Sequence, residues 1–135
     1  MDKRFFEFLS HDERVDCLAL GTVAKHERGA ALLRTGERRR ALHVLLGGEA
    51  EVRRSDGALL SRLVSGDVYG EMSFVQISGA SADVTATTDG TTLTLTEVQL
   101  DELFRERPGL AAGLYRSLAA ELSRRLRALS DRFAA

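Results

Sequence analysis

The sequence has a single cysteine, Cys17, which excludes an intramolecular disulfide. It lies in an apolar stretch, residues 15–20, and this context predicts a buried, inert thiol more than a redox-active one. No apolar run approaches the roughly 18 residues that span a membrane, and the N-terminus lacks the apolar core of a signal peptide. We therefore expect a cytoplasmic protein that makes no membrane contact.

An excess of charge of either sign is also lacking. The 19 Lys and Arg residues nearly balance the 20 Asp and Glu residues, and the net charge of −1 gives no general attraction to nucleic acid or to an anionic surface. We expect no DNA partner, and no residues follow position 135 to supply a helix-turn-helix. Lys and Arg are absent from positions 63 to 104, and the predominance of Arg over Lys is typical of a GC-rich bacterial genome.

Short apolar runs between turn residues fill the middle of the chain. At 135 residues the protein is long enough for one domain that buries about two-thirds of its unfolded surface. Short strands at regular spacing predict a mainly β fold, a barrel or jelly roll. The predicted strands are residues 22–27, 31–34, 41–46, 49–54, 58–64, 83–87 and 91–96.

Helices are predicted at both ends of this β region. Ser10 with Glu13, and Thr96 with Gln99, have the spacing of a capping box and predict helices over 11–20 and 97–106. Pro108 suits the first turn of a third helix, over 109–132. Its apolar series is Leu110, Leu114, Leu118, Leu122, Leu126, Leu129 and Phe133, with Arg116, Arg124, Arg125, Arg127 and Arg132 expected on other faces. At about 1.5 Å per residue this helix is roughly 37 Å long, so we expect its second half to outrun the β region.

The remaining signal is the segment from Gly66 to Ala86. Gly66 and Gly70 bracket a short β-prone segment, and Gly70 precedes a run long enough for two helical turns at most. A glycine before a helix N-terminus lets backbone N–H groups approach an anion, which the helix dipole also favours. Glu71 would repel a phosphate at that position but could accept hydrogen bonds from sugar hydroxyls. A phosphate beside a sugar indicates a nucleotide.

This segment resembles the phosphate-binding cassette of the cyclic nucleotide-binding domain of the catabolite-activator type. The family pattern is matched at Gly70, Glu71, Met72, Phe74, Ser81, Ala82, Val84 and Ala86, and turn glycines Gly36, Gly48, Gly57 and Gly66 follow in the family's order. The family's phosphate-binding arginine is replaced by Ala80. The resemblance implies a double-stranded β-helix (β-roll) at 22–96, with the cassette at 66–86, an N-terminal helical segment at 1–21 and C-terminal helices at 97–135.

The resemblance also implies a function. A regulatory sensor would hold cAMP or cGMP on Gly70, Glu71, Met72, Ser73, Ala80, Ser81 and Ala82, and a homodimer would form through Leu118, Leu122, Leu126 and Leu129. Binding would move the C-terminal helix. The replaced arginine leaves a second hypothesis open: a nucleotide-free dimerisation or protein-interaction module with the same fold.

Other chemistry has weaker signals. His11, His26 and His43 are scattered and lack the His-x-His spacing of a metal-binding cupin, so no metal or other cofactor is expected. No nucleophile motif is present, and we expect no enzymatic activity. The run from Arg38 to Arg40 is interpreted as a solvated loop, with contact to an acidic partner or to a phosphate as alternatives.

Overall fold

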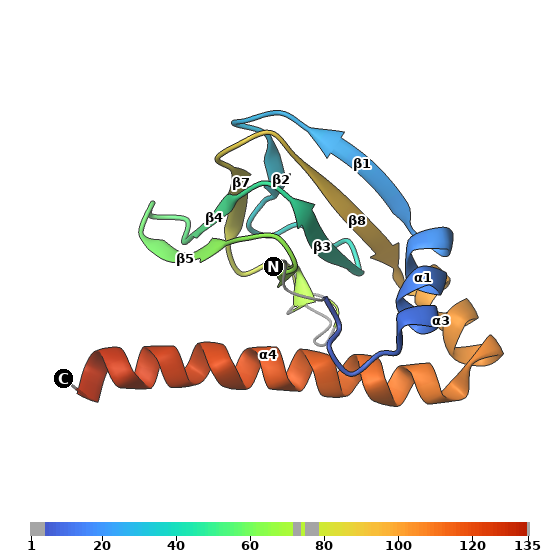
Figure 1. Ribbon diagram of the computed structural model, residues 1–135. Helices are drawn as coiled ribbons and strands as arrows, with labels where there is room; N and C mark the ends of the chain where they lie inside the picture. The colour runs from blue at the N-terminus through green and yellow to red at the C-terminus, as the bar shows by residue number, and fades with distance from the viewer. Residues whose placement is uncertain (1–4, 72–73, 75–78, 135) are drawn as a thin grey trace.

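The protein folds into a β-roll of two antiparallel sheets with helices on one side (Figure 1). The computed structural model describes residues 5–71, 74 and 79–134. Its elements are α1 (His11–Leu20), β1 (Thr22–His26), β2 (Ala31–Leu33), β3 (Ala41–Gly47), β4 (Ala50–Arg53), β5 (Leu59–Leu63), β6 (Val68–Tyr69), β7 (Asp83–Ala86), β8 (Gly90–Thr96), α3 (Glu97–Glu106) and α4 (Pro108–Ala134). The predicted mainly β class with flanking helices is confirmed.

The strands form two four-stranded sheets, with orders β1-β8-β3-β6 and β2-β7-β4-β5. β3 is buried along most of its length because both of its faces are covered. Leu42 and Val44 join the core against the helices, whereas Leu45 joins the core between the sheets. Alternation along one strand thus connects two hydrophobic cores.

Helices α1 and α3 begin at their predicted capping boxes. In each, the Ser10 or Thr96 side chain accepts from the backbone of the third helical residue, whose own side chain accepts in return. Each box satisfies two N–H groups that lack an intrahelical partner. These local contacts explain why both helices begin at the predicted residues.

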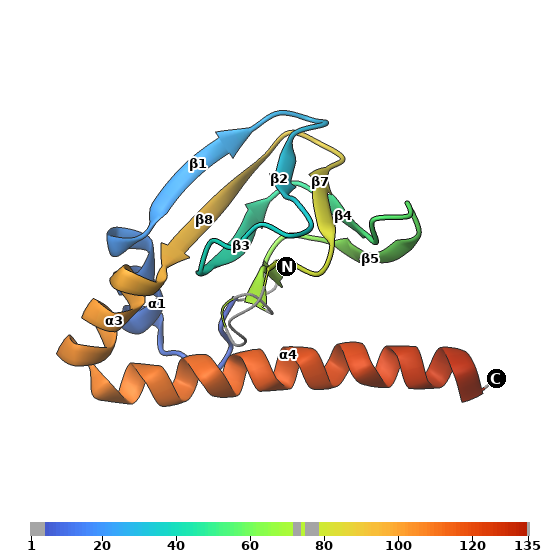
Figure 2. The ribbon, with the colours of Figure 1, turned by 180° about the vertical axis from the view of Figure 1, so that it is seen from behind.

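Helix α4 runs the length of the roll along one side, and both views show its C-terminal end lying beyond the β4–β5 hairpin (Figures 1 and 2). Leu110, Leu114 and Leu118 are buried in the core beneath the first sheet. Leu126 and Leu129 are 68% and 44% exposed. Leu118 therefore packs within its own chain, and the prediction that it contacts a second copy is wrong.

The segment before α1 is fixed to α4. The Phe8 backbone N–H donates to Ser117 Oγ over 3.0 Å, and the Arg116 guanidinium lies 4.0 Å from the Phe8 ring centroid. Gly113 permits this approach, because a Cβ there would lie 2.7 Å from the Phe8 carbonyl oxygen. The N-terminal segment and α4 thus form one packed unit.

Cys17 is completely buried in the core between α1 and the first sheet, as predicted. Burial raises the pKa of its thiol to about 11, and the neighbouring carboxylates of Asp16 and Glu13 add to the effect.

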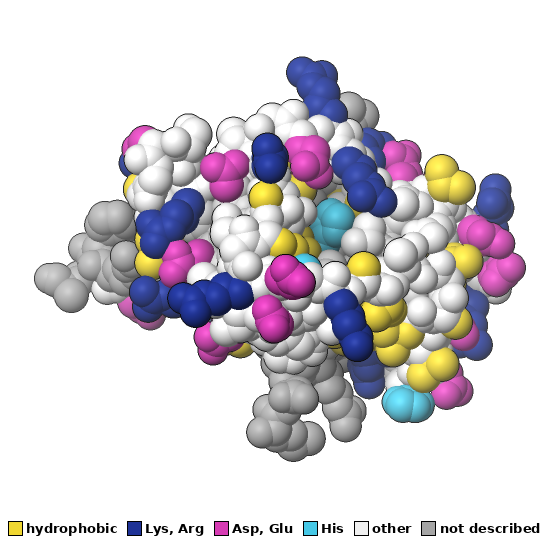
Figure 3. Space-filling view, turned by 90° about the horizontal axis from the view of Figure 1, so that it is seen from above, with side chains coloured by type: hydrophobic (Ala, Val, Ile, Leu, Met, Phe, Trp, Pro, Cys, Tyr) yellow, Lys and Arg dark blue, Asp and Glu magenta, His cyan; other side chains and the backbone are white. Residues whose placement is uncertain are grey.

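Among the residues that the structure describes, no helix is long and apolar enough to cross a membrane. Seen from above, basic and acidic side chains are interspersed over the roll (Figure 3).

Candidate functional site

A cavity of about 100 Å³ opens between the second sheet, the start of the cassette and α4. Most of its lining is aliphatic or aromatic, and the few polar groups lie at Ser61, Glu71, Ser81 and Arg125. The full lining is Leu33, Val52, Ser61, Leu63, Tyr69, Gly70, Glu71, Ala80, Ser81, Ala82, Val84 and Arg125. An apolar hollow with a few convergent polar groups is the usual form of a small-molecule site.

Five of the seven predicted ligand residues line this cavity: Gly70, Glu71, Ala80, Ser81 and Ala82. They come from two segments, residues 70–71 and 80–82, which the fold brings together at the same cavity. Met72 and Ser73, the other two, lie outside the described residues. The segment that resembled the cassette therefore does border a cavity.

Gly70 gives the chain the conformation that carries it into the cassette. Its φ is 78°, in the left-handed region that favours glycine, and a Cβ at this position would lie 2.8 Å from His43 Cδ2. A larger residue would therefore be strained and would also collide with the strand beneath. Gly70 thus fixes the position of Glu71 at the cavity mouth.

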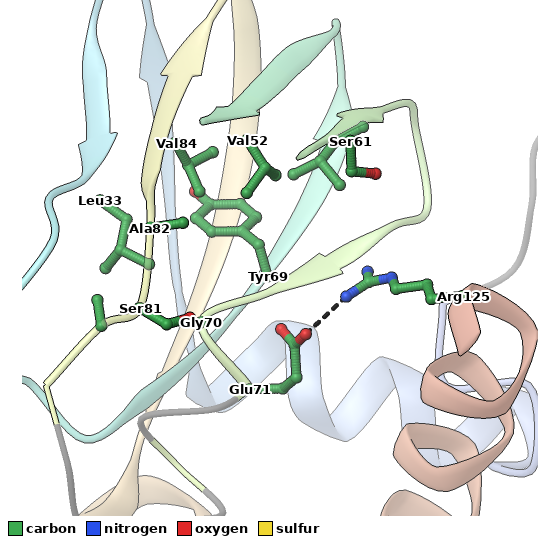
Figure 4. Close-up of a pocket in the computed structure, with 12 residues that line it drawn as sticks. Leu33, Val52, Ser61, Tyr69, Gly70, Glu71, Ser81, Ala82, Val84 and Arg125 are labelled. Carbon is green, nitrogen blue, oxygen red and sulfur yellow. Dashed lines mark hydrogen bonds and ion pairs between the residues drawn. The ribbon is translucent and has the colours of Figure 1, made fainter. Parts of the chain in front are cut away.

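Glu71 is paired with an arginine from the far end of the sequence (Figure 4). Arg125 Nη1 donates to Glu71 Oε1 over 2.6 Å, and Arg125 Nη2 donates to the Val68 carbonyl oxygen over 2.7 Å. The Glu71 side chain is 10% exposed and that of Arg125 is 30% exposed. Two directed bonds from one guanidinium hold α4 against the entrance of the cavity.

This pair belongs to a chain of alternating charges. Arg125 Nε lies 3.5 Å from Glu121 Oε1, and Arg124 contacts both Glu121 at 2.8 Å and Glu7 at 2.7 Å. The line Glu71, Arg125, Glu121, Arg124, Glu7 runs from the cavity, over α4, to the N-terminal segment. It couples three parts of the fold that are distant in sequence.

Arg125 was not predicted to face the roll. It follows Leu118 by seven residues, two helical turns, so it lies on the same face as the buried leucines. The prediction that the arginines of this helix lie on other faces is wrong for Arg125. One signal in the sequence could have predicted this position: Arg125 is a cation at a position where the helical pattern has apolar residues.

Tyr69, which lines the cavity, stacks on the ring of His43. His43 and Tyr69 have centroids 4.9 Å apart with 14° between their planes. Tyr69 Oη lies 3.1 Å from Thr92 Oγ1, and His43 Nδ1 lies 2.9 Å from Thr94 Oγ1. His43 Nε2 is buried without a hydrogen-bond partner among the described residues.

These buried groups have shifted pKa values. Burial lowers the pKa of His43 to about 4, with a smaller contribution from Arg39. Burial raises the pKa of Tyr69 to about 12, against the opposing effect of its bond to Thr92. Both rings are therefore uncharged at neutral pH, and the cavity floor contributes no ionic group.

Ala80 stands where the family arginine was expected, and it is 5% exposed. Its backbone is fixed to the preceding loop, because its N–H donates to the Glu37 carbonyl over 2.8 Å and its carbonyl accepts from Gly36 over 2.9 Å. A methyl group at this position extends the apolar wall of the cavity. The backbone N–H of Ala80 is engaged by Glu37.

The sequence interpretation placed Arg40 in a solvated loop, but its side chain contacts two other parts of the protein. Its Nη2 donates to the Phe74 carbonyl oxygen over 2.7 Å, and its Nη1 lies 2.9 Å from Glu97 Oε2. It thereby connects Phe74 of the cassette to α3. Arg38 and Arg39 are exposed.

Among the residues that the structure describes, no group of three His, Cys, Asp or Glu side chains could hold a metal ion.

A β-roll whose cassette lines a cavity, with a C-terminal helix across the mouth, defines a class of regulatory ligand-binding domain. The family model for the cyclic nucleotide-binding domain matches residues 23–107. The chain therefore belongs to the cyclic nucleotide-binding domain family.

The chain is similar to several known proteins in sequence or in structure. The catabolite activator protein of Thermus thermophilus is 26% identical, with a TM-score of 0.77, over 96% of this chain and 61% of that one. A cyclic nucleotide-binding domain from Methylobacillus flagellatus is 24% identical, with a TM-score of 0.84, over 92% of this chain and 72% of that one. Glutaminase 1 of Bradyrhizobium diazoefficiens is 30% identical over 125 residues, which are 93% of this chain and 20% of that protein. The chain thus spans only a fifth of this relative's length.

Proposed function

We propose that the protein is a regulatory sensor module in which occupancy of the cavity controls the position of α4. The observation that carries the proposal is the contact of Arg125 with Glu71 and Val68, since it places a residue of α4 in the wall of the cavity. A group that binds at Glu71 necessarily meets Arg125. Ligand binding and helix position are therefore coupled through one guanidinium.

The size of the cavity supports this coupling. Pockets for drug-sized ligands usually measure about 300–1,000 Å³, whereas this cavity encloses about 100 Å³. A ligand as large as a nucleotide would therefore extend past the mouth and displace Arg125. The second half of α4 would then lose its fixed position on the roll.

The family ligands cAMP and cGMP are the first candidates. Ala80 cannot supply the charge-assisted bond that an arginine gives a phosphate, a contribution of about 1.5–3 kcal/mol. This difference corresponds to a loss of about tenfold to a hundredfold in affinity. On this basis any binding of these nucleotides by the native chain is weak.

A homodimer through the second half of α4 would transmit the output. Leu122, Leu126 and Leu129 lie past the last buried leucine, and Leu126 is 68% exposed. Leucines at such spacing can pack against the same helix of a second copy. A change in the position of α4 would then alter the dimer.

A second candidate is a module that functions without any ligand. The observation that favours it is that Glu71, the residue expected to bind a sugar hydroxyl, is already bonded to Arg125. In this case the ion pair is a permanent structural contact, and α4 serves only to bind a partner.

Hydrogen exchange of residues 119–134 tests the sensor proposal without knowledge of the ligand. We expect Arg125→Ala to increase exchange along this segment while the β strands stay protected, because α4 loses its contact at the cavity. Arg124→Ala, which removes a neighbouring cation outside the cavity, is the matched control. Unchanged exchange in Arg125→Ala would refute control of α4 from the cavity.

A further inference from the structure

The charges around the cavity specify its ligand more narrowly than the family does. Among the described residues that line it, Glu71 and Arg125 are the only charged side chains, and they neutralise each other. The cassette adds no cation, because Lys and Arg are absent from positions 63 to 104 of the sequence. The cavity therefore has no positive charge to spare for an anion.

This deficit persists whether or not α4 stays in place. With α4 in place, the Arg125 guanidinium is engaged by Glu71, the Val68 carbonyl and the Glu121 carboxylate. With α4 displaced, the cation leaves and the Glu71 carboxylate remains at the mouth alone. In either state a phosphate would lie beside a carboxylate in a poorly hydrated apolar site, where like charges repel most strongly.

An uncharged ligand with hydroxyl groups avoids this repulsion. A carboxylate is only an acceptor, so Glu71 selects a ligand that donates, and a guanidinium is only a donor, so Arg125 selects one that accepts. A hydroxyl group does both, and Ser61 and Ser81 are further hydroxyls in the lining. The aliphatic walls and the Tyr69 ring suit an apolar or aromatic body.

We propose that the cavity takes an uncharged, hydroxyl-bearing ligand with a flat apolar body, of the nucleoside class, in preference to a nucleotide. This inference rests on the proposed sensor function and specifies the ligand class of the same site. In the bound state, Glu71 accepts from the sugar hydroxyls while the ion pair with Arg125 is shared or opened.

The test is calorimetric titration of the full chain with two matched pairs, adenosine against cAMP and guanosine against cGMP. Within each pair the base is the same and the cyclic phosphate is added. At least one nucleoside should bind about tenfold or more tightly than its cyclic nucleotide, a difference of about 1.4 kcal/mol. Its 2′-deoxy form should bind more weakly, because a donor to Glu71 is lost.

Glu71→Gln gives an independent readout of the charge argument. It removes the carboxylate and releases Arg125, so the ratio of nucleoside to nucleotide affinity should fall towards or below one. Hydrogen exchange of the strands in this variant confirms that the roll is intact. Equal or tighter binding of the cyclic nucleotides by the native chain would overturn the inference, as would no binding of any of the four probes at millimolar concentration. Neither result touches the sensor proposal, which unchanged exchange of α4 in Arg125→Ala would refute independently.

Discussion

Arg125 and Glu71 are 54 residues apart in sequence, yet Nη1 of the arginine lies 2.6 Å from Oε1 of the glutamate. Arg125→Ala should lower the free energy of unfolding by about 1–3 kcal/mol, because it leaves a nearly buried carboxylate without its cation. Arg124→Ala should cost less than about 1 kcal/mol, since its pairs are exposed to solvent. Urea denaturation of the two variants measures the difference. Equal losses of unfolding free energy in the two variants would mean that the bond to Glu71 stabilises the protein no more than an exposed ion pair does.

The protonation of His43 should make stability depend on pH. Its pKa is about 4 in the folded protein and about 6.5 when unfolded, so the unfolded chain binds the proton more readily. The stabilisation is complete above pH 6.5 and is lost as the pH falls from 6.5 to 4, to a total of about 3 kcal/mol. Urea denaturation of the native chain and of His43→Gln at pH 7, 5.5 and 4 isolates this contribution. Parallel curves for the two proteins would contradict the assignment.

Cys17 should react slowly with thiol reagents in the folded protein. With a pKa of about 11, it is roughly 0.1% ionised at pH 8, and it has no exposed surface. A chromogenic disulfide reagent should therefore modify it at a rate limited by unfolding, and at once in 8 M urea. Rapid modification under native conditions would show that α1 opens readily.

Leu126→Asp should weaken self-association without harming the fold, because this side chain is 68% exposed on α4. Val98→Asp, at a position that is 76% exposed on α3, is the matched control away from the expected interface. Sedimentation at tens of micromolar should show a dimer for the native chain and for the Val98 variant, and a monomer for the Leu126 variant. A monomeric native chain would refute the dimer.

Ala80→Arg should raise the affinity for cAMP by at least about tenfold, because the new guanidinium would supply the missing cation. Its effect on adenosine should be small. Thermal unfolding with and without millimolar cAMP compares it with Ala119→Arg, which adds the same charge at an exposed position of α4. A variant that melts lower and ignores cAMP would mean that a cation at position 80 is merely buried and unpaired.

The fold could be read from sequence because its signals are local. Each capping box needs only four residues, and the turn glycines at 36, 48, 57 and 66 all have positive φ in the structure. Such constraints act between neighbours and do not depend on the rest of the chain. The strand pattern and the position of the cassette follow from them.

The electrostatics of the candidate site could not be read in the same way. Ala80 showed that a cation was missing, but the arginine that lines the cavity comes from a helix 45 residues further along the chain. Arg40 likewise acts on Phe74 through tertiary contact, 34 residues away. The periodicity of a helix predicts which residues share a face. Which part of the protein that face contacts depends on how the chain folds back onto the roll.

The attachment of the N-terminal segment to α4 has a mechanical consequence. Phe8 is hydrogen-bonded to Ser117, and Glu7 is paired with Arg124, the residue that precedes the cavity contact Arg125. Domains joined before and after this module would therefore both be attached to α4. A shift of α4 would change the orientation of these domains relative to each other. By reciprocity, a force applied to one of them would alter the affinity of the cavity for its ligand.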